Sequence, residues 1–189
     1  MIPTDRFAQV EVRSATELRV WLTAHHAQAD SVWLVTWKKA PGAPYVSIHA
    51  VLDELIAFGW IDGLRRKLDD LRTMQLISPR RQQAWAQTYK ERASRLEAEG
   101  RMHPAGLAAI TAAKAAGRWD QMAAVDALMV PKDLAEALGL HADRFDGLGA
   151  SYRRNVLRWL HHAKRPDTRA ARIAMIVTAT EQSKRLQQI

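Results

Sequence analysis

Hydrophobic positions along the first half of the chain switch between helical and strand spacing, which predicts a mixed fold. Residues 14–17 (SATE) form a capping box, in which a serine hydroxyl and a glutamate satisfy two free amides, so we expect a helix over 15–25. The run 31–38 is rich in β-branched and aromatic residues with a partial period of two, which predicts a strand. The sequence PGAP ends that strand, and Ser47 can cap a second helix that reaches Phe58.

The next segment, 58–81, predicts a hairpin followed by a helix. Two glycines bracket the aromatic and β-branched stretch FGWIDG, which is typical of a short strand. The sequence LDDL suits a chain reversal, and alternation over 73–77 predicts the partner strand of an antiparallel hairpin. Ser78-Pro79 has the form of an N-cap followed by a proline at the first helical position, so we predict that a helix begins near Arg80.

Beyond Trp85 the spacing of apolar residues is helical only. One helix is expected to end at Gly100, and an alanine-rich helix follows Pro104. Further helices are expected over 131–138, over 151–163 and after Pro166, and the Gly147-Leu148-Gly149 step is the expected flexible joint.

These patterns predict an α+β fold, in which an N-terminal lobe of a small antiparallel sheet with helices is followed by a C-terminal all-helical part. We place the α+β lobe, with the hairpin and the long helices, at 1–125 and a small C-terminal helical module at 126–189.

The charge of the chain directs attention to anionic partners. With 189 residues, a formal net charge of +8 and a pI near 10.2, the protein is suited to nucleic acid, an anionic lipid head group or an acidic protein, although such a surplus can also serve solubility alone. The basic residues crowd two segments, one with Arg65, Arg66, Lys67, Arg72, Arg80 and Arg81, and one with Arg153, Arg154, Arg158, Lys164, Arg165, Arg169 and Arg172. If the two clusters share a face, they form one basic patch.

Composition also bounds the compartment and the chemistry. The absence of cysteine excludes disulfides, thiol catalysis and thiolate metal sites, and it suits a reducing compartment. No apolar run is long enough for a membrane helix, and the first residues lack the apolar core of a signal peptide, so we expect a cytoplasmic protein that is not transmembrane. No GxSxG, HExxH or P-loop sequence occurs, and neighbouring histidines diverge on a helix. We therefore expect no metal and no cofactor, and nothing indicates the oligomeric state.

Two hypotheses of different classes follow. The favoured one is a non-enzymatic binding or stress-response protein with a basic surface for an anionic partner. The alternative is an enzyme of unrecognised type with a pocket around Trp60 and Asp62, in which Asp62 and Lys38 are the acid/base candidates. Against that alternative, Asp62-Gly63 is a common turn pair, and the tryptophans of this segment are typical core residues as well as possible stacking partners.

The anion- or ligand-binding candidates are Lys38, Trp60, Asp62, Arg65, Arg66, Arg80, Arg165 and Arg169. Arg80 and Arg81 would lie in the first turn of the expected helix, where the macrodipole disfavours cations, and this favours an anion or carboxylate nearby.

Several separate motifs, in order along the chain, carry a resemblance to a known family. They are Trp37-Lys38-Lys39, Phe58-Gly59-Trp60-Ile61-Asp62-Gly63, Ile77-Ser78-Pro79-Arg80-Arg81, Trp85, Leu96-Glu97-Ala98-Glu99-Gly100-Arg101-Met102 with Pro104-Ala105-Gly106, and Trp159 with Ala163-Lys164-Arg165 and Thr168-Arg169. Together they resemble the bacteriocin-protection, YdeI/OmpD-associated (OmdA-type) family over nearly the whole chain.

The resemblance implies a bacterial cytoplasmic protein linked to protection against bacteriocins or antimicrobial peptides, and linked by name to an outer-membrane porin. It implies no reaction and no catalytic residues. Antimicrobial peptides are mostly cationic, and a net charge of +8 repels them at long range, so we expect an indirect stress role rather than direct capture.

Overall fold

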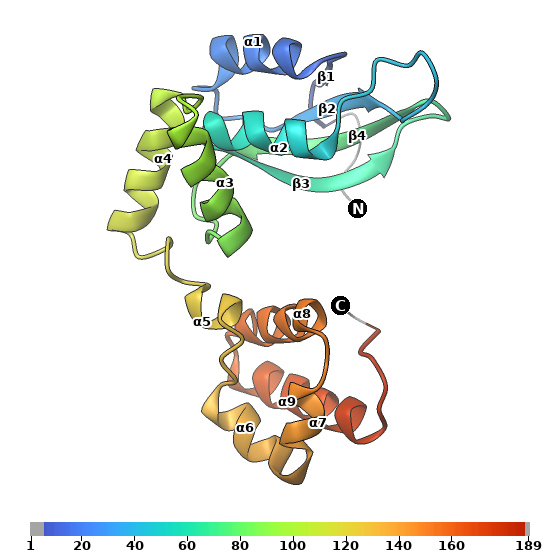
Figure 1. Ribbon diagram of the computed structural model, residues 1–189, viewed down its shortest axis with the longest axis vertical. Coiled ribbons are helices and arrows are strands. Elements are labelled where there is room, and N and C mark those ends of the chain that lie inside the picture. The colour runs from blue at the N-terminus through green and yellow to red at the C-terminus, as the bar shows by residue number, and fades with distance from the viewer. Residues whose placement is uncertain (1–5, 188–189) are drawn as a thin grey trace. The chain divides into compact units, whose positions relative to one another are not determined.

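The computed structural model describes residues 6–187, and the chain divides into two units at Asp120 and Gln121. The boundary that we placed between residues 125 and 126 from the sequence lies a few residues further along. The first unit has an α+β fold and the second is helical, and each is described separately below (Figure 1).

The described residues of the N-terminal unit form a four-stranded sheet and four helices: β1 (Gln9–Glu11), α1 (Ala15–His25), β2 (Val32–Trp37), α2 (Ile48–Ala57), β3 (Trp60–Lys67), β4 (Arg72–Pro79), α3 (Gln87–Ala98) and α4 (Pro104–Ala115). The C-terminal unit is helical among its described residues: α5 (Ala123–Asp126), α6 (Lys132–Leu138), the short 3-10 helix η1 (Gly139–His141), α7 (Ala142–Asp146), α8 (Ala150–His161) and α9 (Pro166–Glu181). These elements confirm the predicted α+β class with an all-helical C-terminal part.

The sheet is mixed, and this corrects the expectation of a purely antiparallel one. Its strand order is β1-β2-β4-β3, in which β4 pairs antiparallel with both β2 and β3, whereas β1 pairs parallel with β2. The predicted hairpin is therefore confirmed, but β1 was missed. Helix α1 forms the crossover that two parallel neighbouring strands require.

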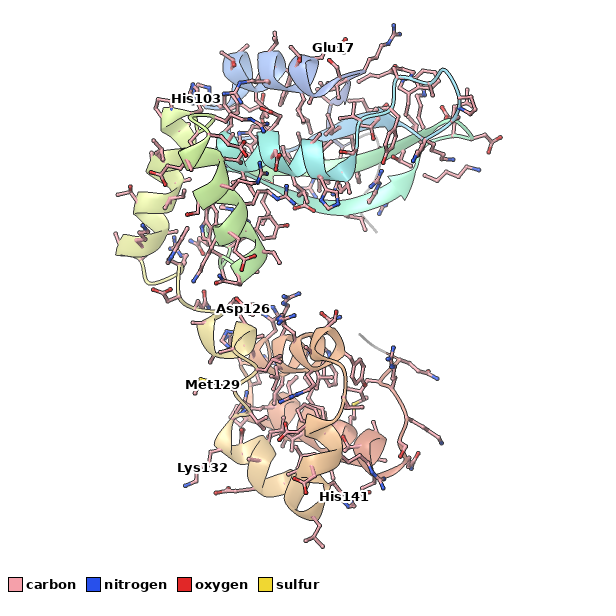
Figure 2. All side chains as sticks on the ribbon, viewed as in Figure 1. Glu17, His103, Asp126, Met129, Lys132 and His141 are labelled. Atoms are coloured by element: carbon pink, nitrogen blue, oxygen red, sulfur yellow. The ribbon has the colours of Figure 1, made fainter. Side chains whose placement is uncertain are left out.

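Two helix starts follow the predicted capping chemistry. The Ser14 hydroxyl accepts a hydrogen bond from the Glu17 amide at 3.1 Å, and the Glu17 carboxylate accepts one from the Arg13 amide at 2.8 Å. Figure 2 labels Glu17 at this helix start. The Ser47 hydroxyl accepts from the Ala50 amide at 3.1 Å at the start of α2. Each bond satisfies an amide that a helix leaves free in its first turn.

The helix predicted near Arg80 is wrong. Strand β4 continues through Pro79, which pairs with Trp60, and the Arg80 amide then donates to the Gly59 carbonyl at 2.9 Å. Pro79 is tolerated there because it is the last residue of the strand. Helix α3 begins only at Gln87, so Arg80 and Arg81 lie in a loop and the argument from the helix dipole does not apply to them.

Two apolar layers flank the sheet. On one face, Leu34, Trp60 and Ile77 pack with residues of α1 and α2, such as Leu18 and Leu55, into the main core (Figure 1). On the other face, Trp33, Val35 and Met74 form a smaller buried cluster. This two-sided burial explains why β2 reads as a nearly continuous apolar run rather than as a strict alternation.

Helix α4 packs very closely on the end of α2. A Cβ atom placed on Gly106 would lie 2.2 Å from the Ala57 carbonyl oxygen, and one on Gly59 would lie 2.9 Å from the Ala109 Cβ. Gly59 also has a φ of +73°, which L residues with side chains rarely adopt. The glycines of the FGW and PAG motifs therefore have a structural role.

The C-terminal unit is tied together by Arg169 of α9. Its guanidinium binds the Asp133 carboxylate of α6 through Nε at 2.5 Å and Nη2 at 2.9 Å, and its Nη1 donates to the Leu160 carbonyl at the end of α8 at 3.4 Å. One side chain thus joins three helices. Among the described residues, no helix combines the length and the apolar character needed to cross a membrane.

Candidate functional site

Two of the predicted site residues, Asp62 and Arg80, meet at one aromatic ring in the N-terminal unit. Asp62 lies within β3, paired with Ile77, so it does not cap a turn as the Asp-Gly sequence suggested. Its carboxylate accepts hydrogen bonds from the Tyr89 hydroxyl at 2.5 Å and from the Gln75 side-chain amide at 3.1 Å. Burial and this carboxylate raise the pKa of Tyr89, so the phenol stays protonated at neutral pH and acts as a donor.

Arg80 stacks on two aromatic rings, Trp85 in the loop that follows β4 and Tyr89 in the first turn of α3. Its guanidinium carbon lies 4.1 Å from the Trp85 ring centroid and 5.1 Å from that of Tyr89, and its Nη1 donates to the Ala84 carbonyl at 3.2 Å. The Nε and Nη2 atoms are buried and have no hydrogen-bond partner among the described residues. Burial lowers the pKa of Arg80 to about 10, a value that still leaves it charged at neutral pH.

Lys38 and Trp60 do not join this cluster. Trp60 has no exposed surface, and its indole N–H donates to the His26 carbonyl at 3.2 Å. Lys38 donates to the carbonyls of Asp69 and Asp70 at 2.8 and 2.9 Å, which fixes the turn of the hairpin. This turn lies about 20 Å from Trp60, because strands rise about 3.3 Å per residue over the length of β3. An enzyme pocket that combines Lys38, Trp60 and Asp62 is therefore contradicted.

Arg65 and Arg66 lie on opposite faces of the sheet, as neighbours on a strand must. Arg65 is exposed and donates to the Thr73 hydroxyl at 3.1 Å, whereas the Arg66 guanidinium lies 5.6 Å from the ring centroid of Trp33 on the other face. Together with the burial of Arg80, this geometry contradicts the single arginine surface that we predicted for the hairpin.

Arg165 and Arg169 belong to the C-terminal unit and differ in environment. Arg169 is neutralised by Asp133, whose pKa is lowered by that hydrogen-bonded pair. Arg165 is exposed at the N-cap of α9. It lies beside Lys164 in the connection between α8 and α9. We use the name α8–α9 corner for these two residues together with Arg158 and His162 at the end of α8.

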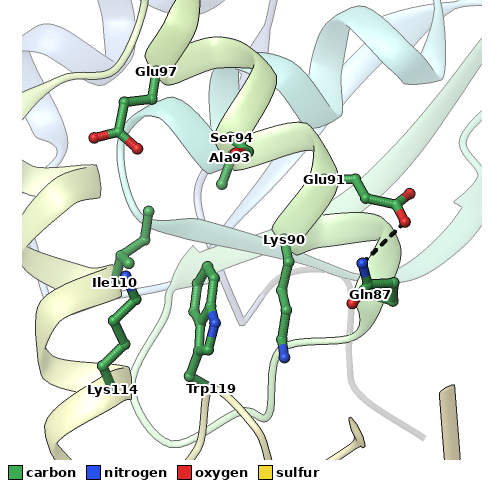
Figure 3. A pocket seen from close by; sticks show the side chains of 9 residues that line it. All are labelled: Gln87, Lys90, Glu91, Ala93, Ser94, Glu97, Ile110, Lys114 and Trp119. Atoms are coloured by element: carbon green, nitrogen blue, oxygen red, sulfur yellow. Dashed lines mark hydrogen bonds between the residues drawn. The ribbon is translucent and has the colours of Figure 1, made fainter. Parts of the chain in front are cut away.

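A pocket of about 260 Å³ between α3 and α4 is lined by residues that the sequence did not single out, apart from Glu97 of the Leu96–Met102 motif (Figure 3). Its lining residues are Gln87, Lys90, Glu91, Ala93, Ser94, Glu97, Ile110, Lys114 and Trp119. We call it the Trp119 pocket. The indole of Trp119 lies 5.3 Å from the Lys90 ammonium, 5.1 Å from that of Lys114 and 5.1 Å from the Trp85 ring. No local motif marks these residues as one site, because two separate helices and the segment after α4 supply them.

These features define the chain as a two-part protein, in which an α+β unit is followed by a basic helical unit. Comparison with family models matches residues 10–109 to a domain of unknown function, DUF8412, and residues 127–183 to the family described as bacteriocin-protection, YdeI or OmpD-associated. The first match spans more than half of the chain, so the protein belongs to the DUF8412 family.

The second match confirms the resemblance drawn from the motifs, but only for the C-terminal part, which is of the bacteriocin-protection type. The expectation that this resemblance extends over nearly the whole chain is corrected, since residues 10–109 match a different model. Comparison with the curated proteins and with the solved structures found no match.

Proposed function

We propose that this protein is a non-enzymatic binding and stress-response protein of the bacteriocin-protection type, which holds an anionic partner at the α8–α9 corner. The observation that carries the proposal concerns Arg158, Lys164 and Arg165. No carboxylate among the described residues forms an ion pair with any of these three cations, whereas Arg169 nearby is already paired with Asp133.

The electrostatics of the C-terminal unit support an anionic partner. Residues 121–189 contain eleven Lys and Arg residues against seven Asp and Glu residues. Burial, together with the positive charge of Lys164 and its neighbours, lowers the pKa of His161, which adjoins the corner. Guanidinium groups bind phosphate and carboxylate oxygens through paired hydrogen bonds, so Arg165 and Arg158 have the chemistry for a nucleic acid, a lipid head group or an acidic protein.

Binding experiments on the full chain test this proposal. We expect a duplex DNA, or vesicles that contain phosphatidylglycerol, to bind at low ionic strength with an affinity that falls as salt rises. The double variant Lys164→Ala/Arg165→Ala should bind about thirty-fold more weakly, because each of the two cations contributes about 1 kcal/mol near an anionic surface. The matched control Lys132→Ala/Lys184→Ala removes the same charge elsewhere in the unit and should keep most of the affinity.

Absence of binding to both anions at low salt would overturn the proposal, as would an equal loss in the variant and in its control. We also propose a cytoplasmic location, which the lack of cysteine supports and which cell fractionation can test. If protection depends on the corner, cells that express the double variant should survive an antimicrobial peptide less well than cells that express the control variant.

A further inference from the structure

The Trp119 pocket has opposite charges at its two ends. At one end the ammonium groups of Lys90 and Lys114 both lie within 5.3 Å of the Trp119 ring centroid, and Asp120 pairs with Lys90 alone, at 2.9 Å. Lys114 has no ion-pair partner among the described residues, so its positive charge is unmatched. A cation held against an indole face keeps a fixed position, because the ring attracts it.

The other end of the pocket is acidic. Figure 3 shows Glu97 and Trp119 at different ends, with Ser94 on the same helix as Glu97. The Glu97 carboxylate has no ion-pair partner among the described residues, while Glu91 is held by Gln87 at 3.0 Å. The side chain of Glu97 can therefore accept a cation from a ligand.

Apolar side chains lie between the two charged ends. Ala93 of α3 is 1% exposed and Ile110 of α4 is 8% exposed, and both line the pocket. Both side chains are already almost buried, so a small apolar group of a ligand would gain contact with them rather than remove much further surface from water. The volume of about 260 Å³ restricts the ligand to a small molecule.

The spacing of the charges selects the length of the ligand. Lys90 and Glu97 are two turns apart on the same face of α3, so they are separated by about 10 Å along the helix axis at 1.5 Å per residue. The charged groups extend from positions this far apart, so a ligand that reaches both of them needs well-separated charges of its own. A chain of two residues spans up to about 7 Å, so a dipeptide with free termini separates its charges much further than a single α-amino acid does.

We infer that the Trp119 pocket is a binding site for a short zwitterionic peptide, with its carboxylate at Lys114 and Lys90, its ammonium at Glu97 and an apolar side chain on Ala93 and Ile110. This site lies in the N-terminal unit, and it is independent of the anionic partner proposed for the C-terminal unit.

Isothermal titration of the full chain with three probes tests the inference. The probes are glycyl-leucine, N-acetyl-glycyl-leucine, which lacks the ammonium, and glycyl-leucinamide, which lacks the carboxylate. We expect glycyl-leucine to bind most tightly, and each modified probe to bind about two- to five-fold more weakly, the range for pairs that remain partly solvated.

Variants of the exposed pocket residues assign each charge. In Glu97→Gln the free and the acetylated peptide should bind equally, and in Lys114→Gln the free peptide and the amide should approach equality. Lys132→Gln, an exposed change in the other unit, should behave as wild type, and circular dichroism checks that each variant folds. No binding of glycyl-leucine at millimolar concentration would overturn the inference, as would variants that weaken all three probes alike.

Discussion

Replacing Gly106 by alanine tests the close contact between α4 and α2. The new Cβ would lie 2.2 Å from the Ala57 carbonyl oxygen and 2.9 Å from the Met102 Cε. The methionine can rotate away, but the carbonyl cannot, because it accepts the His103 amide at 2.9 Å and belongs to the last turn of α2. Helix α4 must therefore move.

Two effects of opposite sign decide the result. Alanine in a helix is favoured over glycine by at most about 1 kcal/mol. A carbon and a carbonyl oxygen normally approach no closer than about 3.3 Å, so the helix must shift by about 1 Å. That shift loosens Ile110 and Ala113, which α4 contributes to the main core, and overpacking of this kind costs about 1–3 kcal/mol. We expect a net loss of about 1–2 kcal/mol in the free energy of unfolding.

Urea denaturation followed by circular dichroism measures this loss, and Gly147→Ala is the matched control. A Cβ on Gly147 meets its nearest atom, the Asp143 carbonyl oxygen, at an ordinary 3.4 Å, and its φ of −72° suits alanine. The control should change stability by less than about 0.5 kcal/mol. If Gly106→Ala is as stable as wild type while the control is neutral, the packing of α4 on α2 is not tight and the reasoning fails.

Two further predictions concern titratable groups. His103 accepts a hydrogen bond from the Ala105 amide through Nδ1 at 3.2 Å, and burial is the main cause that lowers its pKa. The neutral imidazole therefore stabilises the fold fully above about pH 6.5, and this contribution is lost as the pH falls through the lowered pKa of the folded state. His103→Asn keeps an N-cap acceptor that does not titrate, so its loss of stability between pH 8 and 5.5 should be smaller than that of wild type; equal losses would contradict the role of His103. The ion pair with Arg169 lowers the pKa of Asp133, so the pair stabilises the fold above about pH 4 and this stabilisation is lost at lower pH. In Arg169→Ala, an NMR titration should find the pKa of Asp133 raised relative to wild type. An unchanged pKa of Asp133 would refute the pair.

Local signals in the sequence were sufficient where the backbone satisfies itself over a few residues. The helix from Ala15 follows from its capping box, and the start of α2 follows from Ser47, because the donors and acceptors that fix these ends are three or four residues apart. The same reasoning failed for Ser78-Pro79. The pairing of Pro79 with Trp60 across the hairpin outweighed the local preference for a helix start.

Two features of the structure depend on contacts between distant segments, and local sequence patterns do not predict them. Strand β1 has three residues, two of them exposed, so it carries almost no periodic signal and exists because it pairs with β2. The Trp119 pocket is a similar case. Lys90 and Lys114 come together only because α3 and α4 lie side by side around the same indole, and no spacing along the chain predicts that.

The environments of the motif residues indicate where a partner should be sought. Gly59 and Gly106 allow α4 to approach α2, Trp60 fills the core, and Arg169 binds Asp133 and the end of α8. These side chains are already occupied by the fold, so these members of the motifs identify the architecture and not the ligand. Binding requires groups with unmatched charge at the surface or in a pocket. Among the described residues, such groups include exposed members of the motifs, Lys164 and Arg165, and residues outside them, such as Lys114. Substitutions at these exposed positions should change binding while leaving stability nearly unchanged.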